Sequence, residues 1–254
     1  MGGIVTVILL IFSCDKLQPD HPQAGIKVVA SQPLNEADIN SYADSINSTL
    51  DQFEKQESLV FSRGDRSFSV VKYVKNGEPV LYIEKGDSGE YEASEKRYYL
   101  HEGRLVLYTE KNKSFTSPTP VSYLCSYFRN NILFYTKRKT ATDEIQLKSS
   151  SFAETEPSRK DQYLDIVGLE NALKQNHDFN LVFEGIAEYP KAKYLILSRN
   201  GLNTYRAALR VDSEDDLIHE LATNPDRYAG SKLDLTWKIN KDNEAIYQSG
   251  RVQR

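Results

Sequence analysis

The sequence predicts a mainly β protein with some α structure (α+β), and three observations lead to this prediction. A hydrophobic content of 39% and a net charge of −4 over 254 residues are typical of a folded globular chain and exclude a disordered one. A helical apolar period occurs early in the chain, and strand-like segments separated by turn residues follow from Leu59 onward. The expected architecture is an N-terminal helix packed on an antiparallel β-hairpin-repeat meander or barrel, followed by a small second β domain.

The first fourteen residues, MGGIVTVILLIFSC, predict export. The apolar run is too short to cross a bilayer but has the length of a signal-peptide core. It ends in Ile11-Phe12-Ser13-Cys14, which resembles the lipobox of bacterial lipoproteins. The resemblance implies that residues 1–13 are a signal peptide, that Cys14 is lipidated, and that residues 14–33 tether the body to a membrane. The segment before the apolar run departs from the pattern because it has no Lys or Arg.

Asn35 opens the predicted N-terminal helix. Asp38 follows three residues later, as in a capping box. Apolar residues then recur at spacings of three and four, at Ile39, Tyr42, Ala43, Ile46, Leu50 and Phe53. One apolar stripe of this kind predicts a helix of about 20 residues that covers a sheet.

An internal repeat follows within the predicted domain 34–152. YVKNGEPVLYIEK from Tyr73 and YLHEGRLVLYTEK from Tyr99 align without gaps at an offset of 26, and a looser copy, SYFRNNILFYTKRK, starts at Ser126. Between the two strand-like runs of each copy lie residues that accept the positive φ of a hairpin turn: Gly77, Gly103 and the pair Asn130–Asn131. The repeat unit is therefore expected to be a β-hairpin, in a meander of about eight strands.

The strand centres VLYI, LVLY and ILFY are apolar at every position, whereas a sheet with one wet face alternates. Both faces near these centres must be covered. The N-terminal helix can cover one face, and barrel closure, the second domain or a molecule outside the chain can cover the other. If an apolar ligand or a partner does so, its candidate surface consists of three repeat tyrosines: Tyr82, Tyr108 and Tyr135.

Residues 153–180 predict a linker and a short helix, and residues 181–254 predict a separate domain. Three strand-like runs lead to a capping-box pattern, Ser213 to Asp216, that opens a helix with Leu217, Ile218 and Leu221 on one side. Two further strands follow, and the alternation of the first, KLDLTWKI, places Trp237 in the core. In this order of elements, three strands, a helix and two strands, residues 181–254 resemble an OB-fold.

OB-folds often bind oligonucleotides through basic grooves and exposed aromatic residues. Residues 181–254, however, hold 11 acidic and 11 basic side chains. Arg206 and Arg210 share a strand face, and we expect them to have local carboxylate partners. No nucleic-acid partner is therefore expected.

The sequence contains no motif for catalysis, metal or cofactor binding. The four histidines form no HxH or HExxH pattern, and GxSxG, GxxxxGK[ST] and GxGxxG do not occur. Cys125, in the apolar string VSYLCSYF, is expected to be a small buried hydrophobe. We therefore expect neither an enzyme nor a metal or cofactor site.

Together these features predict a lipid-anchored protein of the bacterial cell envelope that serves as a non-catalytic protein-interaction or scaffold module. Two alternatives stay open. A periplasmic carrier of a lipid or other apolar ligand would need an unfilled cavity behind the strands. An envelope-stress or surface sensor is similar to the known pairing of a lipocalin-like barrel with an OB-fold.

Overall fold

The structure, a computed structural model, describes residues 34–89, 91–156, 164 and 166–253. Fourteen of the described strands join in one hydrogen-bonded sheet, and the predicted mainly β class is confirmed. The predicted signal peptide, the lipidation site Cys14 and the tether lie outside the described residues.

Helix α1 (Glu36–Asn47) begins at the predicted capping box. The side chain of Asn35 accepts a hydrogen bond from the N–H of Asp38, and the Asp38 carboxylate accepts one from the N–H of Asn35. The helix ends earlier than expected, and a short 3-10 turn, η1 (Leu50–Gln52), follows it. Three side chains of α1 are buried in one apolar cluster with strand residues such as Leu81 and Leu107: Ile39, Ala43 and Ile46.

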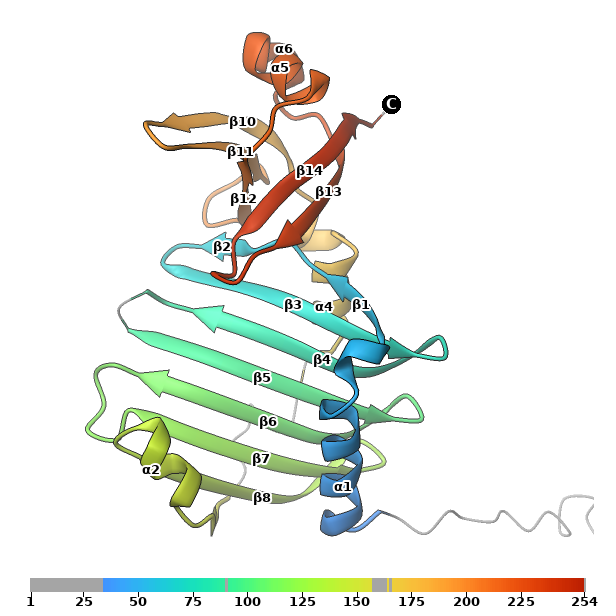
Figure 1. Ribbon diagram of the computed structural model, residues 1–254, viewed down its shortest axis with the longest axis vertical. Coiled ribbons are helices and arrows are strands. Elements are labelled where there is room, and N and C mark those ends of the chain that lie inside the picture. The colour runs from blue at the N-terminus through green and yellow to red at the C-terminus, as the bar shows by residue number, and fades with distance from the viewer. Residues whose placement is uncertain (1–33, 90, 157–163, 165, 254) are drawn as a thin grey trace, which may run out of the picture. The chain divides into compact units, whose positions relative to one another are not determined.

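Two short strands, β1 (Glu54–Glu57) and β2 (Phe61–Arg63), precede the meander of long antiparallel strands in Figure 1. The meander consists of β3 (Arg66–Lys75), β4 (Glu78–Asp87), β5 (Glu92–His101), β6 (Arg104–Ser114), β7 (Val121–Arg129) and β8 (Ile132–Ala141). The predicted turns are confirmed, because φ is +83° at Gly77, +70° at Gly103 and +62° at Asn131. Each copy of the repeat is therefore one hairpin.

A β-bulge precedes each of these turns, after Tyr73, Tyr99 and Tyr127. These three tyrosines therefore occupy equivalent places in the hairpins. The third copy of the repeat starts at Tyr127, one residue later than the expected start at Ser126.

The chain leaves the meander through helix α2 (Glu144–Ser149) and strand β9 (Ala153–Glu154), which pairs with β8. Helix α2 was not predicted, because its six residues are too few to show a helical period. Helix α4 (Ile166–Leu173) and the 3-10 turn η2 (His177–Phe179) lie where a short helix was expected.

The C-terminal part contains three strands, two helices and two more strands. They are β10 (Val182–Tyr189), β11 (Ala192–Ser198), β12 (Arg206–Val211), α5 (Asp216–Thr223), α6 (Pro225–Tyr228), β13 (Leu233–Ile239) and β14 (Ala245–Val252). Helix α5 is capped by Asp215 rather than by Ser213, because the Asp215 side chain accepts the N–H of Ile218 at 3.0 Å. The predicted apolar side of α5 is buried.

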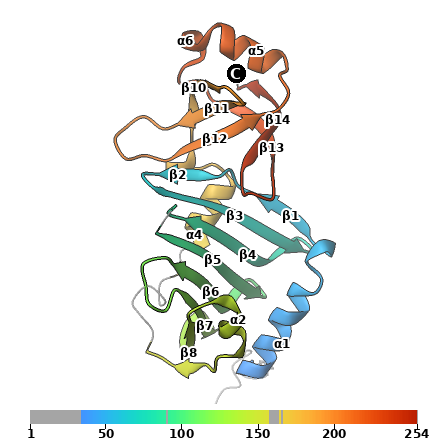
Figure 2. The same ribbon diagram turned by 60° about the vertical axis from the view of Figure 1, so that its left-hand side comes forward.

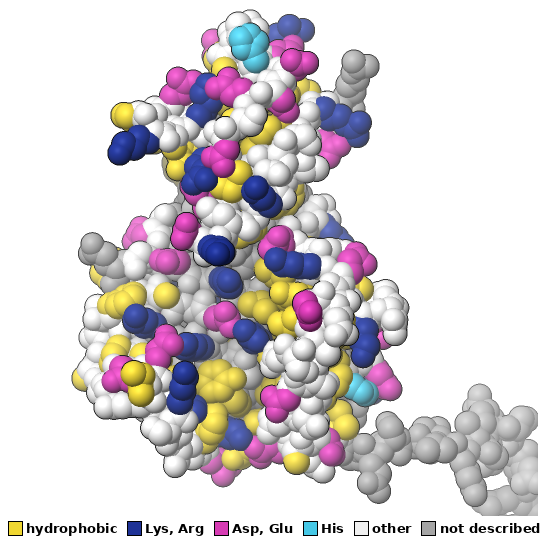
Figure 3. All heavy atoms as spheres, viewed as in Figure 1, with side chains coloured by type: hydrophobic (Ala, Val, Ile, Leu, Met, Phe, Trp, Pro, Cys, Tyr) yellow, Lys and Arg dark blue, Asp and Glu magenta, His cyan; other side chains and the backbone are white. Residues whose placement is uncertain are grey.

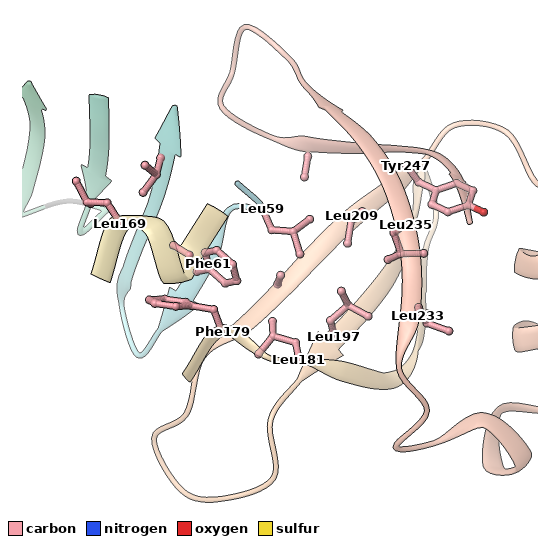
Figure 4. Packing of buried hydrophobic residues seen from close by; sticks show 14 of the residues in the cluster. Leu59, Phe61, Leu169, Phe179, Leu181, Leu197, Leu209, Leu233, Leu235 and Tyr247 are labelled. Atoms are coloured by element: carbon pink, nitrogen blue, oxygen red, sulfur yellow. The ribbon is translucent and has the colours of Figure 1, made fainter. Parts of the chain in front are cut away.

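Strand β2 connects the C-terminal strands to the meander. It pairs with β12 on one side, where Phe61 lies opposite Ala207, and with β3 on the other (Figure 2). A continuous apolar core crosses this junction, as the side chains around Phe61, Phe179 and Leu209 show in Figure 4. Trp237 packs against this core half-buried, and its Nε1–H donates a 3.2 Å hydrogen bond to the carbonyl of Ser58.

Successive side chains of the meander point to opposite faces of the sheet. We call the face whose side chains cluster with α1 the α1 face, and the opposite face, whose side chains cluster with Leu169 of α4, the α4 face. The α1 face is the one seen in Figure 3, where acidic and basic side chains are interspersed. The α4 face contains a hollow over the strands of the meander.

Candidate ligand-binding site

The hollow on the α4 face has a volume of about 770 Å3. Its floor is the sheet from β3 to β8, and Leu169 of α4 lies in one wall. Phe179 and Tyr205 lie at the end toward the C-terminal strands. A hollow of this volume is within the range of small-molecule sites.

Strand register arranges the α4 face in three rows that run across the strands. Each row consists of cross-strand partners on β4, β5, β6, β7 and β8. The tyrosine row is Tyr82, Tyr98, Tyr108, Ser126 and Thr136; the charged row is Glu84, Lys96, Glu110, Leu124 and Arg138; the small-residue row is Gly86, Ser94, Asn112, Ser122 and Thr140. The hollow lies over the charged and small-residue rows.

The small-residue row makes the floor deep. A Cβ atom added to Gly86 would lie 2.8 Å from Oγ of Ser94, so β4 has no room for a side chain beside Ser94. Ser94 and Ser122 add one hydroxyl group each. The floor is therefore low and polar rather than filled by apolar side chains.

The charged row places donors and acceptors side by side. Lys96 Nζ lies 2.7 Å from a carboxylate oxygen of Glu84, and Tyr98 Oη donates to the other oxygen at 3.2 Å. Tyr108 Oη donates to Glu110 at 3.1 Å. Burial, together with the Glu110 carboxylate, raises the pKa of Tyr108 above its ordinary 10.0, so this phenol stays a donor at neutral pH. Arg138, at the β8 end of the row, has no ion pair among the described residues.

Asn112 has an unsatisfied acceptor in the floor. Its Nδ2 donates a 2.5 Å hydrogen bond to Glu92. Its Oδ1 is buried and has no hydrogen-bond partner in the described part of the chain. An unpaired buried acceptor costs about 1–3 kcal/mol, so a donor that reached it would be bound favourably.

Aromatic rings close one end of the hollow. Tyr205 stacks on Phe179 with ring centroids 4.7 Å apart, and Phe68 meets both rings edge-on. The guanidinium of Arg63 lies 4.7 Å from the centroid of Tyr205. These contacts hold the end wall and Arg63 in fixed positions.

The charges around the hollow balance. Its basic side chains are Arg63, Arg66, Lys96 and Arg138, and its acidic ones are Glu84, Asp87, Glu92 and Glu110. No group of His, Cys, Asp and Glu side chains suited to a metal ion occurs among the residues that the structure describes. The hollow is thus suited to hydrogen bonding with an uncharged or charge-balanced molecule.

Two of the three predicted surface tyrosines, Tyr82 and Tyr108, lie on the α4 face. Both are nearly fully buried, and Tyr108 contributes to the hollow. Tyr135 lies on the α1 face, where it pairs with Tyr127 at 5.7 Å between ring centroids. Tyr82 and Tyr108 stand five positions after the turn glycine, but Tyr135 stands four positions after Asn131, and one residue reverses the face of a strand side chain. Thr136 takes the place of Tyr108 in the third hairpin.

Two other predicted groups have the expected surroundings. Cys125 is buried on the α1 face, and burial raises the pKa of its thiol to about 11. Arg206 pairs with Glu184, and Arg210 pairs with Asp212 and Glu244, so the expected carboxylate partners are present. These contacts compete with any anionic ligand on this strand.

The hollow has no sequence motif, because its floor residues are ordinary surface types scattered over five strands. Gly86, Ser94, Asn112 and Ser122 become neighbours only through the registers of three strand pairs. The available signal was that small and polar residues occupy corresponding positions of neighbouring strands. This signal can be recognised only once the strand register is known.

Comparison with known proteins gives no match: no family model, no curated protein and no solved structure is significantly similar to this chain. Among the described residues, the longest apolar helices fall short of the length needed to cross a bilayer.

Proposed function

We propose that this chain is a lipid-anchored, non-catalytic binding protein of the bacterial cell envelope, and that its ligand binds in the hollow on the α4 face. The observation that supports this most is the buried, unpartnered Oδ1 of Asn112 in the floor of a hollow of about 770 Å3. Natural folds pair nearly all buried polar atoms, so an exception in a concave site points to a ligand.

The proposed anchor rests on the string Ile11-Phe12-Ser13-Cys14. Replacing Cys14 by Ser is expected to move the protein from the membrane fraction to the soluble fraction of lysed cells. Unchanged membrane association of Cys14→Ser would remove the lipid anchor from the proposal and leave the binding site untouched.

The finer architecture belongs to the same proposal. We propose that residues 181–254 form an OB-like barrel, because β12 pairs in parallel with β14 and β14 pairs with β13. Backbone hydrogen bonds between Phe183 and residues 230 and 231 bring β10 close to the start of β13. We also propose that α1 is a permanent cover of the α1 face, which leaves the α4 face for binding.

Filling the hollow tests the binding site. Ser94→Leu adds bulk to the floor, and Ala93→Leu, at the preceding residue of β5, adds similar bulk to the opposite face. A thermal-shift screen of the full-length chain with a library of small metabolites is expected to find ligands that raise the Tm of wild type and of Ala93→Leu. Equal shifts for Ser94→Leu would contradict binding in the hollow.

A protein-interaction role is the second candidate, supported by the outer edge of β8. Among the described residues, strand β9 pairs with Lys137 and Arg138 of β8, and the N–H of Thr155 donates to the carbonyl of Thr136 at 3.1 Å. The earlier residues Ile132 and Phe134 are 70% and 41% exposed beside this edge. An apolar strand edge of this kind can accept a strand from a partner.

This candidate predicts a specific contact. A photo-crosslinking residue placed at Ile132 should give one discrete adduct in cells, and the same residue placed at Lys85 should give none. Loss of the adduct in a Phe134→Asp background would tie it to the edge. Absence of any adduct at Ile132 would exclude the edge as an interface.

The carrier and sensor alternatives have less support. The floor of the hollow holds Glu84, Lys96, Glu110 and Asn112, and an apolar chain would strip water from these groups without replacing their hydrogen bonds. Nothing in the described residues favours the sensor.

A further inference from the structure

We infer that the ligand of the hollow is a neutral, polyhydroxylated molecule, namely an uncharged oligosaccharide. This inference rests on the proposed function of the hollow and adds the chemical class of the ligand. It depends on three properties of the floor: charge balance, alternation of donors and acceptors, and the orphaned acceptor of Asn112.

Charge balance disfavours ionic ligands. Four basic and four acidic side chains surround the hollow, so it has no excess of either sign to attract a phosphate, a nucleic acid or a polyamine. Lys96, in the middle of the floor, is already neutralised by Glu84 at 2.7 Å. An anion that bound Lys96 would have to displace this carboxylate.

Alternation of donors and acceptors favours hydroxyl groups. In the charged row, carboxylates on β4 and β6 flank the ammonium group on β5, and the guanidinium of Arg138 lies on β8, beyond Leu124 on β7. A hydroxyl group donates and accepts at once, so neighbouring hydroxyls on one ring can satisfy neighbouring groups of opposite kind. The serine hydroxyl groups of the small-residue row can also donate and accept hydrogen bonds.

The orientation of the Asn112 amide determines whether a ligand group that reaches it must be a hydrogen-bond donor or an acceptor. Its Nδ2 is held by Glu92, so the amide is oriented with Oδ1 as the free acceptor. A ligand group that reaches this buried oxygen must therefore be a donor. A ligand hydroxyl supplies that donor without bringing a charge into the hollow.

An extended peptide is the main competitor, and the geometry argues against it. Peptides commonly bind by adding a strand to a free sheet edge. The floor of the hollow is a sheet face whose strands β4 to β7 have neighbours on both sides, so it offers no unpaired backbone. The floor therefore has to bind its ligand through side-chain hydrogen bonds. Hydroxyl groups of a ligand can form such bonds.

A glycan array probed with the full-length chain tests the inference. Neutral oligosaccharides are expected to bind, and sialylated or sulfated forms of the same glycans are expected to bind no better. Asn112→Leu, which removes the acceptor, should weaken binding to the best neutral glycan about tenfold or more. Lys113→Leu, on the next residue and the opposite face, should leave the affinity unchanged.

Fold integrity is checked by the Tm of each variant, and Ser94→Leu provides a second variant that blocks the floor in a different way. If no neutral glycan binds, or if acidic glycans or peptides bind better, the oligosaccharide inference is overturned. If other small molecules still stabilise wild type but not Ser94→Leu, the hollow remains a binding site and only the ligand class was wrong. If Ser94→Leu and Asn112→Leu change no binding event, the proposed function fails as well.

Discussion

The phenol of Tyr82 donates a 2.5 Å hydrogen bond to the carboxylate of Glu170, and this contact joins strand β4 to helix α4. Lys72 Nζ on β3 lies 3.0 Å from the same carboxylate, and Lys174 Nζ lies 2.9 Å from it. Helix α4 forms one wall of the hollow, so this cluster holds the wall against the floor.

The Glu170 cluster predicts acid sensitivity. Burial opposes ionisation of Glu170, but hydrogen bonds from Tyr82, Lys174 and Lys72 outweigh it and lower the pKa of Glu170 to about 2. Since this pKa lies below the ordinary value of 4.5, the contribution to stability is present above pH 4.5 and is lost as the pH falls toward 2. Allowing for solvent screening, Glu170→Gln should lower the free energy of unfolding by about 1–2 kcal/mol at pH 7.

Urea unfolding at pH 7 and at pH 3 measures this effect. The gap between wild type and Glu170→Gln should shrink at the lower pH, and Glu78→Gln, an exposed carboxylate at the start of β4, should show little gap at either. A gap for Glu170→Gln that is equal at both pH values would show that the charge of Glu170 contributes nothing.

The hairpin turns predict a cost for any side chain at Gly103. Its φ of +70° is unfavourable for other residues by about 1–2 kcal/mol, so Gly103→Ala should lower the free energy of unfolding by about that amount. Gly185→Ala is the matched control, because a Cβ there meets nothing within 4 Å and its φ is not in the left-handed region. Equal effects of the two substitutions in urea unfolding would argue against the turn assignment.

Burial of Cys125 predicts an unreactive thiol. Its pKa is raised to about 11, and the thiolate is the reactive form. In a Cys14→Ser background, which leaves Cys125 as the sole thiol of the sequence, Ellman's reagent at pH 8 should react slowly with the native protein and fully in urea. Rapid reaction of the native protein would place the thiol at the surface.

Trp237 gives a fluorescence signal for the core junction, because the sequence has one tryptophan. The ring is half-buried against the core and bonded to the carbonyl of Ser58. The native emission maximum should therefore lie to the blue of the unfolded one, with a red shift on unfolding. A native spectrum like that of tryptophan in water would show that the contact between β13 and the segment before β2 is not formed.

Local signals explain which parts of the fold could be predicted. Capping at Asn35, turn residues such as Gly77, and the alternation around Trp237 depend on residues close in sequence, and the structure agrees at each. The position of the α5 cap shows the limit: Ser213 and Asp215 are both good capping residues, and the sequence pattern favoured the wrong one.

Long-range relationships explain what could not be predicted. Lys72 and Glu170 are 98 residues apart, and no sequence pattern around either residue indicates that they form an ion pair. The pairing of β2 with β12 likewise has no local signal. Tyr135 lies on the α1 face because the third hairpin differs from the other two by one residue. The strand registers that place Tyr135 there also bring the small-residue row together.

Native mass spectrometry of the full-length chain purified from membranes tests most directly whether the hollow holds a ligand. Wild type and Ala93→Leu should carry a bound small neutral mass, and Ser94→Leu should have lost it. An unliganded wild-type mass at every collision energy, or the same bound mass on Ser94→Leu, would contradict binding in the hollow.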